Sequence, residues 1–266
     1  VLPGCVGYLA GVERISATVL DSASDLKVIS RNGTGVDSVD TDAAARNGIT
    51  ICRAAGANAR GVAELAFGLI MALTRSVPFS DLAMKQERWE RRKGIEMAGR
   101  TLGLVGCGAI GKSVAKFALA FDMEVLAFDL YPDSTFQPGD RFRFVDMEQL
   151  LVGSDVISLH CPPPADGKPL LDQSTIARMK DGVYLVNTAR GGLIDPDAAV
   201  ASLASGKVSG IGVDAHEVEP PTDWRLVQDP RVIATPHIGG FTEESVDRAV
   251  TVAVDQLLSV LAQDAR

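Results

Sequence analysis

Short apolar runs alternate with stretches of helical periodicity along almost the whole chain. The runs expected to form strands cover residues 7–10, 26–30, 49–52, 101–105, 125–128, 155–159, 183–187, 209–213 and 232–234. The helices expected around them cover residues 16–22, 40–47, 59–74, 81–93, 110–121, 147–151, 173–179, 196–205 and 242–261. Strands that alternate with helices indicate parallel sheets with helices on both faces. We therefore expect an α/β fold built from doubly wound parallel sheets.

Two of the expected helices differ from the rest in composition. The helix 59–74 is apolar almost throughout, which is typical of a helix buried in a core. Its apolar surface could also pack against a second subunit, and for this reason we expect a homodimer. The helix 81–93 carries many charges around Trp89 and is expected to be solvated on the surface.

The stretch 101–129 has the most specific pattern in the chain. An apolar run leads into Gly106, Gly108 and Gly111, a helical run follows, and a second apolar run ends at Asp129. The three glycines allow a tight turn, close approach of a pyrophosphate and close helix packing, and the helix start faces the phosphates. Asp129 is spaced to bind the adenosine ribose, and its charge would repel the 2′-phosphate of NADP. We therefore predict a Rossmann-like domain that binds NAD.

Four polar side chains stand at the ends of expected strands or in the loops that follow: Arg190, Asp214, Glu219 and His237. Ligands bind at this edge of a parallel sheet. A guanidinium is suited to clamp the carboxylate of a 2-hydroxy or 2-keto acid. A histidine can exchange the proton that oxidation or reduction of such an acid requires. We assign these tasks to Arg190 and His237, with Glu219 orienting the imidazole.

Each of these residues also has a plainer interpretation. Arg190 could form a surface ion pair, Glu219 could be a solvated loop carboxylate, and His237 could be a turn histidine. His160 also follows an expected strand, and we expect a packing or backbone role for it. His216 is expected to be a loop histidine.

Composition narrows the class of protein. The chain has 266 residues, 46% of them hydrophobic, and a formal net charge of -8. Nucleic-acid binding is not expected, because nucleic-acid binders are usually basic. A membrane partner is not expected either, since the longest apolar run, 65–73, is too short to span a bilayer and no signal peptide is visible. The four cysteines lack metal-type spacing and fit reduced thiols, so we expect a cytoplasmic protein without a metal.

Four motifs resemble those of the D-isomer-specific 2-hydroxyacid dehydrogenases. They are the glycine turn 106–111, the segment 186–192 around Arg190, the segment 214–220 from Asp214 to Pro220, and the segment 235–240 around His237. They occur in the order of the family, and the resemblance covers nearly the whole chain. The resemblance implies hydride transfer between NAD(H) and a small 2-hydroxy or 2-keto acid, with Arg190, Glu219 and His237 as the catalytic residues.

The resemblance also implies further contacts. Asp214 would contact the nicotinamide carboxamide, and the backbone at Thr34 and Gly35 would hold the substrate carboxylate. Asn58 is implied as another substrate contact. The remaining cofactor contacts that the resemblance implies are Gly106, Gly108, Ala109, Ile110, Gly111, Asp129, Cys161, Pro162, Thr188, Ala189, Gly239 and Gly240.

Several stretches are most similar to the D-3-phosphoglycerate dehydrogenases within that family. Arg31 and Arg46 stand where those enzymes carry phosphate-binding arginines, so D-3-phosphoglycerate is the first substrate expected. Both arginines could equally be surface charges. A glyoxylate or hydroxypyruvate reductase is the alternative within the enzyme class. An NAD(H)-sensing scaffold, similar to the corepressors that resemble this family, is the alternative outside it.

We expect two domains with a cleft between them. Residues 73–240 would form the NAD-binding domain, and residues 1–72 with 241–266 the substrate domain. The chain begins at Val1 without an initiator methionine. We therefore expect the substrate domain to lack its first strand and helix at the N-terminal end.

Overall fold

The computed structural model describes residues 2 and 4–264 and divides the chain into two compact units. The small unit comprises Val1–Arg60 and Gly240–Arg266, and the large unit comprises Gly61–Gly239. The boundary predicted near residue 72 falls inside helix α3 (Ala59–Thr74), whereas the structure divides the chain in the first turn of that helix. The reason is that α3 buries Ala63, Phe67 and Ile70 in the core of the large unit.

The small unit is built on a three-stranded parallel sheet with the order β1-β2-β3. Its elements are β1 (Gly7–Ala10), α1 (Ala17–Asp21), β2 (Val28–Arg31), α2 (Thr41–Arg46), β3 (Thr50–Arg53) and the closing helix α9 (Glu243–Asp264). The N–H of Ala43 donates to the Asp40 carboxylate at 2.8 Å, which caps the start of α2. Helix α9 packs along all three strands.

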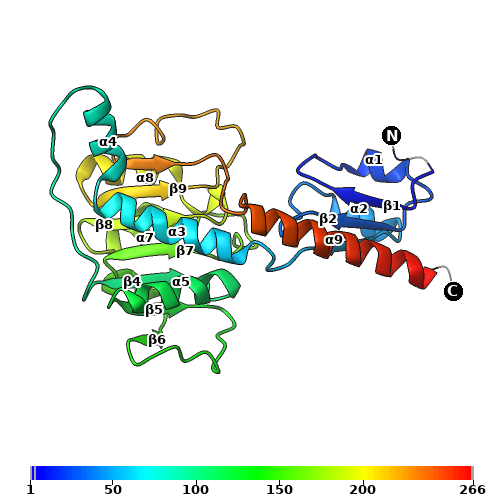
Figure 1. Cartoon of the computed structure of the whole chain (residues 1–266), viewed down its shortest axis with the longest axis horizontal. Helices are drawn as coiled ribbons and strands as arrows, with labels where there is room; N and C mark the ends of the chain where they lie inside the picture. Colours follow the sequence, from blue (N-terminus) through cyan, green and yellow to red (C-terminus); the bar gives the residue numbers. More distant parts are fainter. Residues whose placement is uncertain (1, 3, 265–266) are drawn as a thin grey trace. The chain divides into compact units, whose positions relative to one another are not determined.

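The large unit contains a seven-stranded parallel sheet with the order β10-β9-β8-β7-β4-β5-β6 (Figure 1). Its strands are β4 (Thr101–Val105), β5 (Glu124–Phe128), β6 (Phe142–Phe144), β7 (Val156–Leu159), β8 (Val183–Asn187), β9 (Val208–Val213) and β10 (Val232–Ala234). The strand order reverses between β4 and β7. In open α/β sheets, ligands bind beyond the carboxyl ends of the strands at such a reversal.

Helices cover both faces of this sheet. Besides α3, they are α4 (Val77–Lys85), α5 (Ala109–Ala120), α6 (Met147–Gly153), α7 (Gln173–Arg178) and α8 (Pro196–Ser205). One apolar core contains Leu102 of β4 and Val156 of β7 together with side chains of α3 and α5. The other contains Ile157 of β7 together with side chains of α6, α7 and α8. Successive strand residues therefore point to opposite cores, and the predicted doubly wound parallel sheet is confirmed.

Two details of the large unit differ from the sequence prediction. The helix expected over residues 81–93 is wrong, because α4 ends at Lys85. Glu87 adopts a left-handed φ of 59°, and the N–H of Arg88 donates to the carbonyl of Ala83 at 2.8 Å, a C-terminal capping motif that stops the helix. Trp89 follows in an irregular segment and is 79% exposed. The three-residue strand β6 was not expected, since its apolar run is too short to stand out.

Within the described residues, no single helix has the length and apolar composition needed to cross a membrane. Helices α3 and α4 meet the criteria only as a pair, and they are bent by 65° at the break between them. The core role expected for α3 is confirmed, because Ala63, Ala66 and Ile70 are fully buried.

Candidate active site

The three glycines of the turn after β4 meet different steric demands. Gly106 has a φ of +94°, and a Cβ there would lie 2.6 Å from the carbonyl oxygen of His160. A Cβ on Gly111 would lie 2.2 Å from the carbonyl oxygen of Gly106. At Gly108, by contrast, a Cβ would meet no atom of the described chain within 4 Å. The turn is therefore closely packed on the protein side and open at Gly108, which suits the approach of a pyrophosphate.

The start of helix α5 leaves backbone donors for an anion. Gly108 is the N-cap, and no side-chain hydrogen bond caps this end of the helix. The N–H groups of the first turn, which includes Ala109 and Ile110, thus keep their donor capacity at the positive end of the helix dipole. These residues fit the phosphates of NAD without a charged side chain.

Asp129 follows β5 and is held from two sides. Its carboxylate accepts the N–H of Cys107 in the glycine turn at 2.7 Å and the N–H of Tyr131 at 2.9 Å. A carboxylate has about four acceptor positions, so each oxygen can still accept from a ribose hydroxyl. The tertiary structure thus joins the glycine turn and the acid that the sequence paired only by spacing.

The end of β7 lies beside the glycine turn. A Cβ on Gly106 would approach the backbone N of Cys161 to 2.9 Å, so Cys161 and the following Pro162 border the same turn. Burial raises the pKa of the Cys161 thiol to about 11, which keeps it neutral. Nε2 of His160 lies 2.9 Å from the hydroxyl of Ser158, and its Nδ1 is buried without a hydrogen-bond partner among the described residues. Burial lowers the pKa of His160 to about 4, so this ring is neutral at pH 7.

Replacing His160 with glutamine should make the free energy of unfolding depend less on pH between pH 7 and pH 4. The pKa of His160 falls from 6.5 to about 4 on folding, so the unfolded chain binds the proton more tightly. The neutral ring therefore contributes to the free energy of unfolding in full above pH 6.5. This contribution, about 3 kcal/mol, is lost as the pH falls towards 4. Urea unfolding of both proteins at pH 7 and pH 4 measures this difference. An equal loss of stability in both proteins would contradict the burial of His160.

Asp214 is the buried anchor of the histidine loop. It follows β9, is 1% exposed, and accepts hydrogen bonds from the hydroxyl of Thr235 at 2.5 Å and from the N–H groups of Ile238 and Gly239 at 2.8 Å each. A Cβ on Gly239 would lie 2.9 Å from this carboxylate. Both oxygens of Asp214 thus hold the segment that contains His237, a role that the sequence did not indicate.

Glu219 and His237 form the pair that the sequence predicts. Nδ1 of His237 lies 2.8 Å from Oε1 and 2.9 Å from Oε2 of Glu219, and the side chains are 51% and 42% exposed. The N–H of His216 also donates to Glu219 at 3.1 Å. Nε2 of His216 donates to the carbonyl of Thr235 at 3.0 Å, so His216 joins the two loops. With Nδ1 bound to Glu219, Nε2 of His237 is the nitrogen left to exchange a proton.

Arg190 follows β8 in a turn that is held by Asn187. The side chain of Asn187 donates to the carbonyl of Arg190 at 2.8 Å and accepts the N–H of Ala189 at 3.1 Å. The guanidinium of Arg190 donates to the carbonyl of Ala189 at 2.7 Å. Asn187 was not predicted from the sequence, although a polar residue at the end of an apolar strand is a signal that could have found it.

Gly191 brings the Arg190 turn against the loop of Glu219. A Cβ on Gly191 would lie 2.1 Å from the backbone N of Glu217 and 2.2 Å from the backbone C of His216. The loops after β8 and β9 therefore meet at the carboxyl edge of the large sheet, and Glu219 of the second loop pairs with His237 of the loop after β10. The Thr188 hydroxyl, in the same turn as Arg190, is buried without a partner among the described atoms.

The predicted substrate residues of the small unit fall into two groups. The hydroxyl of Thr34 donates to the side chain of Asn58 at 3.0 Å, and a Cβ on Gly240 would lie 2.8 Å from the same side chain. Thr34 and Gly35 follow the carboxyl end of β2, where Arg31 also lies. Arg46, by contrast, ends α2 just before β3, which begins beside the first residue of β2. The structure therefore places Arg31 and Arg46 at opposite edges of the small sheet and does not bring them together.

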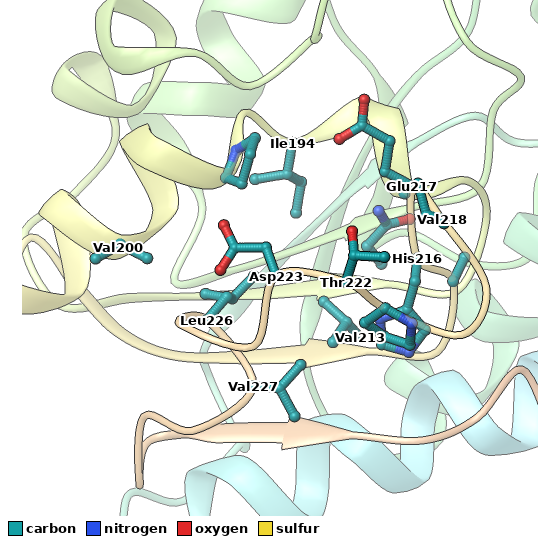
Figure 2. Close-up of a pocket in the computed structure, with 15 residues that line it drawn as sticks. Ile194, Val200, Val213, His216, Glu217, Val218, Thr222, Asp223, Leu226 and Val227 are labelled. Atoms are coloured by element: carbon teal, nitrogen blue, oxygen red, sulfur yellow. The ribbon is translucent and has the colours of Figure 1, made fainter.

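A cavity of about 150 Å³ is bordered by the loop after β9, which contributes Glu217 and Val218 to its lining (Figure 2). Its lining is mainly aliphatic, with Val200 from α8, Val213 from β9, and Leu226 and Val227 from the loop before β10. Arg190, Glu219 and His237 do not line it. The cavity therefore adjoins the loops after β8 and β9 but does not include the three candidate side chains. The described residues contain no group of three or more His, Cys, Asp or Glu side chains that could hold a metal.

A doubly wound sheet with an open glycine turn, an acid after the next strand and an imidazole paired with a carboxylate is typical of NAD-dependent oxidoreductases. Comparison with known proteins narrows this class. Residues 67–239 match the family model of the D-isomer specific 2-hydroxyacid dehydrogenase, NAD binding domain. The chain therefore belongs to the D-isomer-specific 2-hydroxyacid dehydrogenases, and it acts on the CH–OH group of its donors with NAD as cofactor.

Several known proteins are similar over most of the chain. The hydroxypyruvate reductase of Thermotoga maritima is 41% identical over 253 residues, which are 93% of this chain and 82% of that protein. The D-3-phosphoglycerate dehydrogenase of Archaeoglobus fulgidus is 39% identical over 235 residues, which are 87% of this chain and 45% of that protein. A crystal structure of a protein from Thermus thermophilus has a TM-score of 0.90 at 38% identity and covers 98% of this chain and 85% of that one. The chain thus spans about half the length of that phosphoglycerate dehydrogenase.

Proposed function

We propose that Arg190, Glu219 and His237 catalyse the interconversion of a small 2-hydroxy acid and the corresponding 2-keto acid. The observation that supports this most is the meeting of the Arg190 turn and the Glu219 loop at Gly191, next to the histidine loop. Bound NAD(H) accepts or supplies the hydride at C2 of the substrate. Arg190 binds the substrate carboxylate through its planar fork and so orients C2.

His237 moves the proton in this proposal. In reduction, protonated Nε2 donates to the oxygen of the 2-keto group, and in oxidation neutral Nε2 accepts the proton of the 2-hydroxyl group. Glu219 accepts from Nδ1 in both directions, which holds the ring orientation and stabilises the imidazolium form. Asp214 keeps the backbone of the histidine segment in place through Ile238 and Gly239.

We propose an unphosphorylated substrate of the hydroxypyruvate type as the first candidate. Of the two arginines expected to bind phosphate, Arg46 lies at the opposite edge of the sheet from Arg31. Nη1 of Arg31 donates to the carbonyls of Ala10 at 3.5 Å and Asn32 at 3.3 Å. A guanidinium engaged by backbone carbonyls has fewer donors left for a phosphate. D-3-Phosphoglycerate is the second candidate, because Arg31 still ends β2 at the carboxyl edge.

A panel of substrates tests these candidates. We expect NADH consumption with hydroxypyruvate and glyoxylate to exceed NAD reduction with D-3-phosphoglycerate in kcat/KM by at least about tenfold. Arg31→Gln should change kcat/KM for hydroxypyruvate less than about threefold, since no phosphate is bound. A preference for D-3-phosphoglycerate that Arg31→Gln abolishes would support the second candidate. No turnover of any 2-keto or 2-hydroxy acid, with NADH binding intact, would favour the scaffold alternative.

We also propose that the protein is a cytoplasmic homodimer. Helix α3 is largely buried in its own core, whereas α4 exposes three large apolar side chains, with Val77 and Leu82 each 52% exposed and Met84 55% exposed. Packing α4 against a second subunit would cover these side chains. Sedimentation equilibrium measures the mass in solution. A monomer at micromolar concentration would contradict the proposed dimer.

A further inference from the structure

The ribose end of the nucleotide site carries a second carboxylate that the family motif does not include. Asp133 lies four residues after Asp129, in the loop that follows β5. Its carboxylate accepts the hydroxyl of Thr135 at 2.6 Å and the N–H of the same residue at 3.0 Å. Two aspartates therefore follow the same strand end, and the loop structure holds each of them in a fixed direction.

Asp133 also forms an ion pair with Lys112 of helix α5. Nζ of Lys112, in the first turns of the helix, donates to Asp133 at 2.5 Å. The pKa of Asp133 is lowered to about 2, chiefly by this hydrogen bond, so the pair is ionic at pH 7. The pKa of Lys112 is raised, chiefly by the same bond. Asp129 accepts the N–H of Cys107, just before the helix that carries Lys112, so both carboxylates border the start of α5. The Phe136 ring lies 5.4 Å from Nζ of Lys112 and 6.0 Å from Nζ of Lys116.

We propose that Asp133 is a second determinant of the preference for NAD over NADP. In this proposal Asp129 accepts hydrogen bonds from the ribose hydroxyls. Lys112, at the start of α5, is the cation that would otherwise pair with a 2′-phosphate. The hydrogen bond to Asp133 engages that lysine and compensates its charge. With Asp129, Asp133 and Lys112 together, the region keeps one net negative charge beside the 2′ position, and this charge disfavours a phosphate dianion.

Isothermal titration of the full chain with NADH and with NADPH tests this role without depending on the substrate or on turnover. Asp133→Asn should lower the dissociation constant for NADPH about fivefold and change that for NADH less than about twofold, because Lys112 is released. Asp122→Asn is the matched control. Asp122 is an exposed carboxylate bonded to Arg141 beyond the other end of α5, and its replacement changes the formal charge by the same amount. Asp122→Asn should leave both dissociation constants within about twofold.

A second pair of variants keeps the test decisive. Asp133→Asn combined with Lys112→Gln should lose the gain in NADPH binding, because the released cation is then absent. Lys112→Gln alone should raise the dissociation constant for NADPH about fivefold above that of the unsubstituted protein, since two uncompensated carboxylates remain. The proposal is overturned if Asp133→Asn behaves like Asp122→Asn. It is also overturned if the gain persists without Lys112, which would assign it to Lys116 or to net charge. Failure of the proposed catalytic roles would leave these binding results unaffected.

Discussion

Replacing His237 with glutamine should lower kcat by about 10³-fold, because the glutamine amide cannot take up and release the proton that the reaction exchanges. Glutamine can still accept or donate a hydrogen bond, but it cannot pass a proton to the 2-keto oxygen. The dissociation constant for NADH should stay within about twofold, since the glycine turn and Asp129 do not depend on the imidazole. Steady-state kinetics with hydroxypyruvate and titration with NADH measure the two quantities. Near-normal turnover would refute the assignment of His237.

The loop after β9 contains two glutamates, Glu217 and Glu219, and comparing them gives a matched control for the role of His237. Glu219→Gln should lower kcat by about 10- to 100-fold, because the ring keeps a hydrogen bond at Nδ1 but loses the negative charge that stabilises the imidazolium. Glu217 lies two residues earlier and is exposed. Glu217→Gln makes the same chemical change and should leave kcat within about twofold. Equal effects of the two substitutions would show that the loop responds to charge in general and not to the Glu219–His237 pair.

Replacing Arg190 with glutamine should lower kcat/KM for the 2-keto acid by about 10²- to 10³-fold. The reason is that the substrate carboxylate loses a bidentate, charge-assisted contact and with it the orientation of C2. Arg190→Lys should recover only part of this loss, since an ammonium keeps the charge without the planar fork. The dissociation constant for NADH should change little in both variants. Comparing kcat and KM for the three proteins checks the result.

An arginine of the same unit serves as the control for Arg190. Arg178 ends α7, is exposed, and forms an ion pair with Glu148 on the surface. Arg178→Gln should leave kcat/KM within about twofold, because an exposed ion pair contributes little. A loss in the Arg190 variants that is no larger than this would mean that another group binds the substrate carboxylate.

Part of the nucleotide site follows from local sequence. The strand, the three glycines, the helix and Asp129 occur within one continuous stretch, and each step depends on residues close in the chain. The hydrogen bond from Cys107 to Asp129 then joins the ends of that stretch. The alternation of strands and helices likewise predicted the doubly wound sheet, because strand and helix periodicities are themselves local.

Other features required the folded chain. The end of α4 depends on the left-handed conformation of Glu87, which neither charge nor periodicity indicates. The role of Asp214 depends on donors from residues 235–239, more than twenty positions later in the chain. The positions of Arg31 and Arg46 depend on the direction of α2 against the sheet. In each of these cases a short sequence window does not contain the deciding neighbour.

The sequence by itself determined the class of this protein: its sheet architecture, its NAD-binding turn, and the arginine, glutamate and histidine of its candidate site. It could do so because these features lie in short motifs whose residue types have few other chemical uses. Only the tertiary structure decided how the three loops meet, because Gly191 and Asp214 contact segments that are distant in sequence. The pairing of Lys112 with Asp133 belongs to the same group, since twenty-one positions separate the two residues and only the fold of α5 against β5 makes them neighbours.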